Sequence, residues 1–141
     1  PILRPYFETL ARLALELCDR DVLPFRLPIA TSDALRRATR FVREHLSRPI
    51  GVADIAKAAA LSERTVRRRF ASELGLGPHD YLHAARILSA MERLSDPAES
   101  ITMIGLAVGF ESASAFSHAF AAFVGETPRD YRRRALHPDR S

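Results

Sequence analysis

The sequence predicts an all-α protein. Apolar residues recur at helical spacing along nearly the whole chain of 141 residues, and no stretch shows the alternation typical of a strand. The helical patterns stop at glycine or proline, as at Pro49, Gly75 and Gly125. The third observation is an internal repeat with an offset of about 50 residues. The predicted fold is therefore built from two copies of one helical unit.

The predicted elements follow one another with short connections. An amphipathic helix over residues 6–22 places Leu10, Leu13 and Leu17 on one stripe, and a proline-containing linker over 24–29 follows it. Either Thr31 or Ser32 is suited to cap the next helix. The further helices are expected at 33–46, 52–60, 63–74, 78–95, 101–108, 113–124 and from Pro128 onward.

The repeat defines the predicted unit. At an offset of 50, identical residues coincide at the pairs Ser62/Ser112, Phe70/Phe120, Gly75/Gly125, Pro78/Pro128, Asp80/Asp130 and Tyr81/Tyr131. Upstream of Ser112 the offset becomes 49, so that Ile55 meets Ile104 and Glu111 is one extra turn residue. Each copy has a short helix, a tight turn and a longer helix, which is the helix-turn-helix arrangement. The alternative is a repeated α-hairpin that serves packing alone.

Composition narrows the classes of function. The 21 basic residues include a single lysine, Lys57, and exceed the 17 acidic residues, for a net charge of +4. This excess permits binding to nucleic acid, and arginine donates bidentately to phosphate and guanine. Cys18 is the only cysteine, which excludes an internal disulfide framework. No apolar run approaches the ~20 residues that a membrane helix needs, so we expect a cytoplasmic protein that does not bind membranes.

The stretch LSERTVRRRF at 61–70 carries the candidate DNA-reading residues. At about 100° per residue, Val66 and Phe70 share one helix face, while Arg64, Arg67 and Arg68 share roughly the opposite face. Arg69 points to the flank of the buried stripe. The N-terminal residues of the second helix of a helix-turn-helix face the base edges of the major groove. The alternative is a solvated charged face.

The corresponding helix of the second copy differs in chemistry. Its outward positions hold Ser114, Ser117 and His118, so it carries small polar groups and little charge. His118 is a candidate for a base or phosphate contact, or a plain surface residue. We therefore expect the first copy to carry most of the recognition.

Two rival functions are an enzyme and a helical protein-interaction module. His79 and His83 are spaced i, i+4 and could hold a metal from one helix face, but no third ligand motif completes a set. No phosphate-binding glycine loop or nucleophile–base spacing occurs either, so we expect neither an enzyme nor a cofactor or metal. A helical protein-interaction module without DNA binding is the second rival. It would explain the repeat but not the arginines at the start of one exposed helix.

Two segments resemble the AraC/XylS-type bacterial transcription regulators. They are DIAKAAALSERTVRRRFASELGLGPHDYLHAARI (54–87) and IGLAVGFESASAFSHAFAAFVGETPRDYRRR (104–134). The resemblance spans roughly residues 33–134. It implies about seven helices with two helix-turn-helix units, joined by a long bridging helix over 78–95. It also implies that the two recognition helices enter successive major-groove segments on one face of the DNA.

The resemblance implies roles for individual residues. Arg69 stands where the family usually has an aliphatic residue, and Arg86 matches a bridging-helix arginine expected to be structural. The base-reading candidates are Arg64, Arg67, Arg68, Ser114, Ser117 and His118. The candidates for contacts to the DNA backbone are Ser62, Thr65, Ser112, Arg129, Arg132 and Arg133.

The resemblance also implies an organisation and partners. Residues 1–30 are expected to be the terminal helix and linker of a separate sensing or dimerisation domain, 31–135 the DNA-binding domain and 136–141 a tail. A small-molecule effector would act only through that separate domain. The expected partners are double-stranded DNA and RNA polymerase, which an activator recruits to promoters. The helix over 6–22 either forms a homodimer or covers the sensing domain.

Overall fold

The computed structural model describes residues 27–137, and the chain divides into two compact units at Ala85/Arg86. These described residues contain seven helices and no strand, which confirms the all-α prediction. The predicted helix over 6–22 lies outside the described residues. None of the helices that are described is long and apolar enough to cross a membrane.

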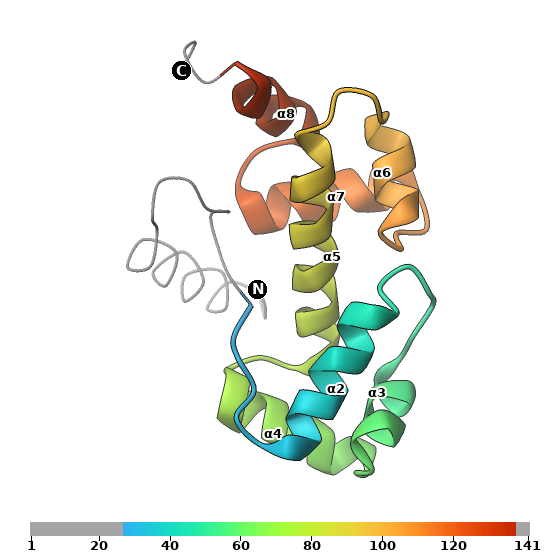
Figure 1. The fold of residues 1–141 in the computed structure, drawn as a ribbon, viewed down its shortest axis with the longest axis vertical. Coiled ribbons are helices and arrows are strands. Elements are labelled where there is room, and N and C mark those ends of the chain that lie inside the picture. Colours follow the sequence, from blue (N-terminus) through green and yellow to red (C-terminus); the bar gives the residue numbers. More distant parts are fainter. Residues whose placement is uncertain (1–26, 138–141) are drawn as a thin grey trace. The chain divides into compact units, whose positions relative to one another are not determined.

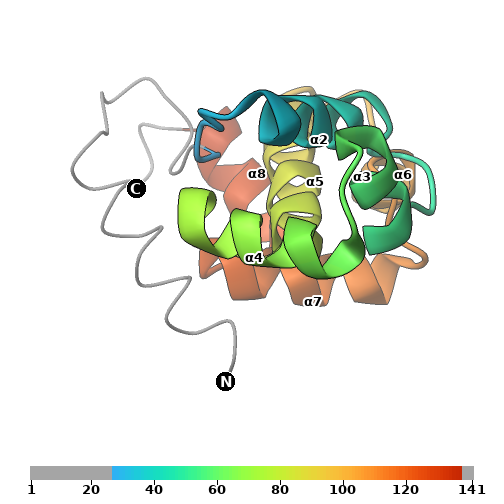
Figure 2. The same cartoon turned by 90° about the horizontal axis from the view of Figure 1, so that it is seen from below.

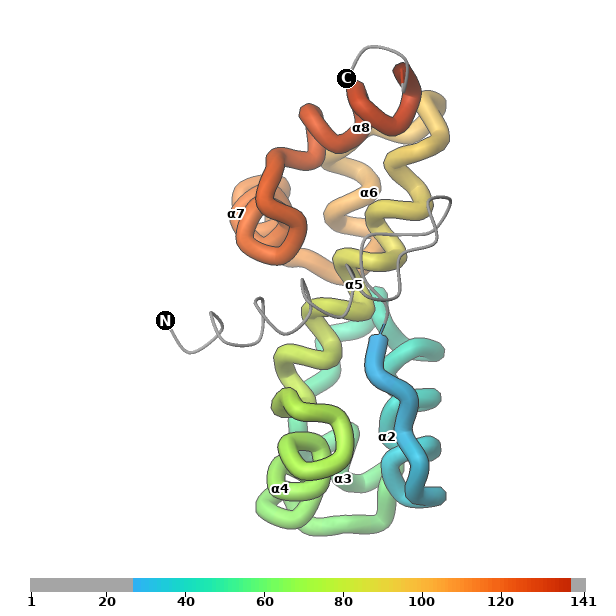
Figure 3. Tube along the Cα trace, turned by 90° about the vertical axis from the view of Figure 1, so that its left-hand side faces the viewer, coloured from blue at the N-terminus to red at the C-terminus, as the bar shows by residue number. Residues whose placement is uncertain are grey.

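The first unit contains α2 (Asp33–Glu44), α3 (Val52–Ala59), α4 (Glu63–Leu74) and the first part of α5 (Pro78–Leu94). Figures 2 and 3 show α2 and α4 on opposite sides of this unit. Its core is formed by apolar side chains from all four helices, and Leu35, Val42, Val66 and Phe70 are fully buried. The stripe Val66–Phe70 predicted from helical spacing therefore holds α4 on the core.

The second unit contains the rest of α5, with α6 (Ile101–Ala107), α7 (Ala113–Val124) and α8 (Pro128–Leu136) (Figure 1). Ile104, Phe116 and Phe120 are fully buried in it. Phe116 lies between Phe110 and Phe120, with ring centroids 5.4 Å and 5.7 Å away. Three aromatic rings thus form the centre of this core.

The repeat is confirmed in the packing. Phe70 meets Tyr81 edge-on at 5.8 Å in the first unit, and Phe120 meets Tyr131 edge-on at 5.6 Å in the second. Both pairs come from positions that coincide at the offset of 50 residues. Such edge-to-face pairs stabilise beyond the area that they bury, by about 0.5–1.5 kcal/mol.

Helix ends agree with the prediction to within two residues, and the ranges 63–74 and 113–124 are confirmed. The largest error is at α2, which was expected to reach Leu46 but ends at Glu44. His45 adopts a non-helical conformation (φ −125°, ψ 28°), and its Nδ1 lies 2.8 Å from the carbonyl of Phe41. Its ring also packs on Phe41, so a local side-chain contact ends the helix. Of the two proposed caps, Ser32 is the one whose hydroxyl accepts from the amide of Leu35.

Candidate nucleic-acid interface

The two tight turns of the repeat share a residue with positive φ and one closing hydrogen bond. Ala60 follows α3 with φ 57°, and Gly109 follows α6 with φ 109°. After each of them the chain closes the same bond: Leu61 N–H donates to Ala56, and Phe110 N–H donates to Gly105, both at 3.0 Å. Both turns therefore need a positive φ, which glycine adopts freely and alanine adopts at a cost.

Serine side chains begin both recognition helices. The Ser62 hydroxyl accepts from the amide of Thr65 at 3.1 Å, and the Ser112 hydroxyl accepts from the amide of Ala115 at 3.0 Å. Ser62 also donates to the hydroxyl of Thr65 at 2.9 Å. These predicted backbone-contact residues thus fix the first turn of each helix, and all three hydroxyls stay at its exposed or half-exposed start.

Three arginines line the exposed face of α4. Arg64, Arg67 and Arg68 are all exposed, as the helical spacing predicts, while Val66 and Phe70 between them are buried. Arg67 forms an ion pair with Glu63 at 3.9 Å across one turn, with both side chains about half exposed. An exposed pair of this kind contributes about 0.3–0.5 kcal/mol, so it orients Arg67 without removing it from solvent.

Arg64 and Arg68 stand apart from the other arginines of this helix. Neither forms an ion pair or a side-chain hydrogen bond with any residue in the described part of the chain. Their guanidinium groups are thus available to a bidentate acceptor such as a phosphate or the O6 and N7 atoms of guanine. They lie in the first two turns of α4, where a helix-turn-helix reads bases.

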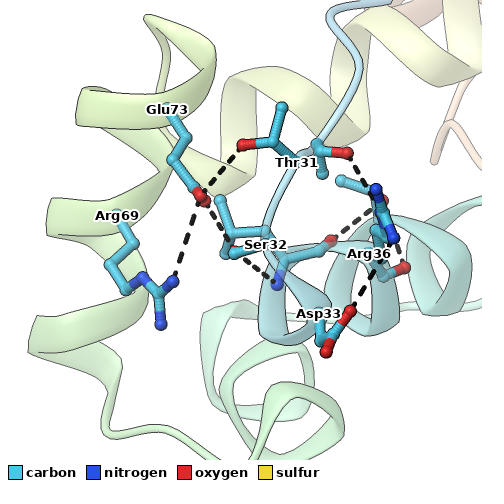
Figure 4. Close-up of polar contacts among 9 residues, drawn as sticks. Thr31, Ser32, Asp33, Arg36, Arg69 and Glu73 are labelled. Carbon is cyan, nitrogen blue, oxygen red and sulfur yellow. Dashed lines mark hydrogen bonds and ion pairs between the residues drawn. The ribbon is translucent and has the colours of Figure 1, made fainter.

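Arg69 differs from the exposed arginines of α4 because it has a partner within the unit, which the sequence analysis did not predict. It is half-buried and lies 3.9 Å from Glu73 on the next turn. Glu73 also accepts from the hydroxyl of Ser32 at 2.9 Å and from that of Thr31 at 3.4 Å (Figure 4). The polar cluster joins the last turns of α4 to the start of α2. Arg69 and Glu73 therefore stabilise the position of the recognition helix.

The exposed face of α7 forms no ion pair with any residue that the structure describes. Ser114, Ser117 and His118 are all exposed, with the small residues Ala113 and Ala115 between them. Small side chains allow close approach to a groove, but they supply fewer strong donors than the arginines of α4. The asymmetry expected between the two copies is thus present in the exposed side chains.

The arginines Arg129, Arg132 and Arg133 of α8 fall into two groups. Arg129 and Arg133 are exposed, and Arg133 lies 3.9 Å from Asp130. Arg132 instead donates to the backbone carbonyls of Leu94 and Asp96, at 3.1 Å and 3.0 Å. Arg132 therefore satisfies carbonyl groups at the end of α5 and ties α8 to it.

Burial perturbs several ionisable groups near these helices. Arg86 is buried, and burial lowers its pKa, which fits the structural role implied by the resemblance. Burial also raises the pKa values of Tyr81 and Tyr131, the two phenols that pack on the recognition helices. Burial raises the pKa of Asp80 as well, against the opposing effect of His79.

The histidine pair singled out in the sequence is present, with the rings of His79 and His83 4.4 Å apart. Between residues 27 and 137, no group of three or more His, Cys, Asp or Glu side chains is arranged to hold a metal ion. The pair thus offers two imidazoles and no further ligand among the described residues.

Comparison with known proteins agrees with the helix-turn-helix arrangement of the two units. A family model described as a helix-turn-helix domain matches residues 55–134. A putative AraC-like transcription regulator of Streptomyces lividans is 39% identical over 87 residues, which is 62% of this chain and 29% of that protein. An uncharacterized helix-turn-helix-type regulator of Staphylococcus aureus is 30% identical over 104 residues, 74% of this chain and 14% of that protein. The chain thus spans less than a third of these relatives.

Solved structures are similar over most of the domain. An AraC-type regulator of Chromobacterium violaceum has a TM-score of 0.70 and 31% identity, covering 74% of this chain and 94% of that one. The DNA-binding domain of AdpA in complex with a target DNA has a TM-score of 0.70 and 32% identity, covering 77% and 97%. These similarities place the chain with DNA-binding regulators rather than with enzymes. The chain belongs to the AraC-type helix-turn-helix family of DNA-binding transcription regulators.

Proposed function

We propose that this domain reads two adjacent major-groove segments, with α4 in one and α7 in the other, and that α4 supplies most of the sequence discrimination. The observation that carries this proposal is the pair of exposed arginines without partners among the described residues, Arg64 and Arg68, at the start of α4. Arg67 is the third base-reading residue on this helix. Ser114, Ser117 and His118 read bases more weakly from α7.

The DNA backbone is contacted from the helix starts and from α8. Exposed hydroxyls beside free amides at a helix N-terminus suit phosphate groups, which supports Ser62, Thr65 and Ser112. Arg129 and Arg133 supply exposed positive charge. Arg132 is better assigned to holding α8, because its guanidinium already donates to two carbonyl groups.

The same proposal covers the whole protein. The domain belongs to a cytoplasmic activator that recruits RNA polymerase and senses a small molecule through another domain. Residues 6–22, outside the described range, contribute to a homodimer. The support for these points is the family membership alone.

Arg68→Ala tests the base-reading role. Duplexes selected from a random pool give the preferred site, and affinity for it is then measured against salt concentration. We expect Arg68→Ala to lose about 1–3 kcal/mol and to relax discrimination at one base step, since a bidentate contact is worth that much. Ser117→Ala on α7 should lose less.

The matched control is Arg40→Ala, because Arg40 is an exposed arginine of α2 whose side chain makes no ion pair or hydrogen bond to any residue between 27 and 137. Equal losses for Arg68→Ala and Arg40→Ala would refute base reading by Arg68. Binding that does not weaken with salt would refute the nucleic-acid proposal and favour the protein-interaction module, because phosphate contacts release counterions.

A further inference from the structure

The first unit has a pocket of about 240 Å³ that lies between the start of the domain, α2 and α5. Its walls are the segment 27–30, one face of α2, and Tyr81 of α5. Helix α4 contributes no residue to this lining, so the pocket is separate from the proposed DNA-reading surface.

The α2 wall concentrates positive charge. Arg36, Arg40 and Arg43 follow one stripe of the helix at spacings of four and three residues, and no acidic side chain lines the pocket. Arg40 and Arg43 are exposed and make no ion pair or side-chain hydrogen bond with any residue that the structure describes. Arg36 lies 3.7 Å from Asp33, but both side chains are well exposed, so this pair neutralises it weakly. The α2 wall therefore favours an anion.

The segment before α2 adds apolar surface beside these arginines. Leu27, Pro28 and Ile29 line the pocket, and Ile29 is 86% exposed. The Nε of Arg36 donates to the carbonyl of Ala30 at 3.5 Å, which holds the segment against α2. Apolar walls with a few polar groups that fix orientation are typical of small-molecule sites.

Two hydroxyl groups complete the lining. The side chains of Thr39 and Tyr81 hydrogen-bond to each other, and Thr39 also donates to the carbonyl of Leu35 at 2.9 Å. Burial raises the pKa of the Tyr81 phenol, and the nearby charge of Arg43 opposes this shift. The phenol is therefore uncharged at neutral pH and does not repel an anion.

The size of the pocket limits the ligand. A volume of 240 Å³ corresponds to roughly eight water molecules at about 30 Å³ each. Sites for drug-sized ligands are larger, at about 300–1,000 Å³. The pocket is thus suited to one small organic anion rather than to a nucleotide or a peptide.

We propose that this pocket binds a small organic carboxylate with an apolar body, with the carboxylate at Arg40 and Arg43 and the body against Leu27 and Ile29. Guanidinium groups pair with carboxylates through two parallel hydrogen bonds. A phosphate ion also pairs with arginine, but it leaves the apolar wall uncovered. This site is independent of the proposed DNA-reading roles.

A ligand in this pocket touches residues that hold the recognition helix in place. Tyr81 packs edge-on against Phe70 of α4, with ring centroids 5.8 Å apart. Ser32, two residues after Ala30, donates to Glu73 of α4 at 2.9 Å (Figure 4). We therefore expect occupancy to change the amide signals of Phe70 and Glu73 as well as those of the lining.

Cyclohexanecarboxylate is the probe, because its ring is apolar and its carboxylate is ionised at about pH 7. It is titrated into the chain of 141 residues labelled with ¹⁵N, at constant ionic strength, and the amide shifts are followed. We expect saturable shifts at Ile29, Arg40, Arg43 and Tyr81, while the signals of α7 and α8 stay in place. Cyclohexanecarboxamide, which has the same shape and no charge, should cause no such shifts.

Arg40→Gln and Arg43→Gln each remove one charge from the pocket, and Lys57→Gln is the control, because it removes one from an exposed position of α3 outside the pocket. Each arginine variant should weaken binding by about 1.4- to 5-fold, the equivalent of one exposed ion pair, and the double variant by about 2- to 25-fold. Lys57→Gln should bind the probe as the parent chain does. Equal affinity in the double variant and the parent chain overturns the proposal.

Three further results would overturn it. The absence of saturable shifts in the parent chain would show that the pocket is closed or already filled. Equal binding of cyclohexanecarboxamide would exclude a role for the arginines. Equal affinity for inorganic phosphate would show an anion site to which the apolar wall contributes nothing.

Discussion

Gly105 of α6 lies close against the side chain of Phe116 in α7, and Gly105→Ala should destabilise the second unit. A Cβ atom at this position would lie 2.7 Å from Cδ2 and Cγ of Phe116 and 2.8 Å from its Cβ. Carbon atoms in contact are about 3.5–4.0 Å apart, so the new Cβ atom would lie about 1 Å too close to these atoms of Phe116. Phe116 is fully buried and packs on the rings of Phe110 and Phe120, so a shift of its ring would displace these neighbours.

The magnitude follows from two opposed effects. Overpacking of a core costs about 1–3 kcal/mol, and we place this site at the upper end because the blocked atoms adjoin the backbone of α7. Alanine is the better helix former by about 1 kcal/mol, which offsets part of that cost. The expected net loss is about 2 kcal/mol.

Urea denaturation, followed separately by signals from each unit, measures this loss. Gly77→Ala is the matched control, because a Cβ there has nothing within 4 Å. It should change the free energy of unfolding by about 0.5 kcal/mol at a helix start. If Gly105→Ala is as stable as Gly77→Ala, α6 and α7 can move apart without cost, and their close contact at Gly105 does not limit stability.

Three further predictions concern the turns, caps and phenols. Ala60→Gly should raise the free energy of unfolding by about 0.5–1 kcal/mol, because glycine adopts the positive φ at this position without strain. An unchanged thermal midpoint would contradict this expectation. Thr127→Ala should lower the free energy of unfolding by about 1 kcal/mol, because it removes the cap of α8, and a lower urea midpoint would measure this. Thr127→Ser should keep the cap and the stability. Burial raises the pKa of Tyr81 above 10.0, so the folded chain keeps a proton that the unfolded chain has lost, and stability should fall as pH rises through 10.0 and beyond. Tyr81→Phe should flatten that fall between pH 9 and 11, and an identical fall would exclude Tyr81 as its source.

The helices could be predicted because their signals are local. Ser62 and Ser112 begin the helices, the paired phenylalanines hold them on the core, and Gly75 and Gly125 end them with positive φ. The early end of α2 depends on the ring of His45 packing on Phe41, which periodicity does not encode. The cap by Thr127 was also missed, although threonine directly before proline is a local signal that could have found it.

The exposed arginines could be predicted for the same reason, since helical geometry separates them from Val66 and Phe70. The contacts that give these arginines different roles could not be predicted from the sequence. Arg132 bonds to carbonyls more than 30 residues away, and Glu73 bonds to hydroxyls about 40 residues away. Such pairings depend on how helices pack, so no spacing in the sequence shows which arginine remains available.

The separation of roles within α4 and α7 has an evolutionary consequence. Stability resides in the serine caps and in Val66, Phe70, Phe116 and Phe120, whereas the outward positions contribute little to it. Substitutions at the outward positions can therefore accumulate without loss of folding, as exposed sites generally allow. Because duplication adds a second such helix, the exposed face of one copy can change while both copies keep their fold.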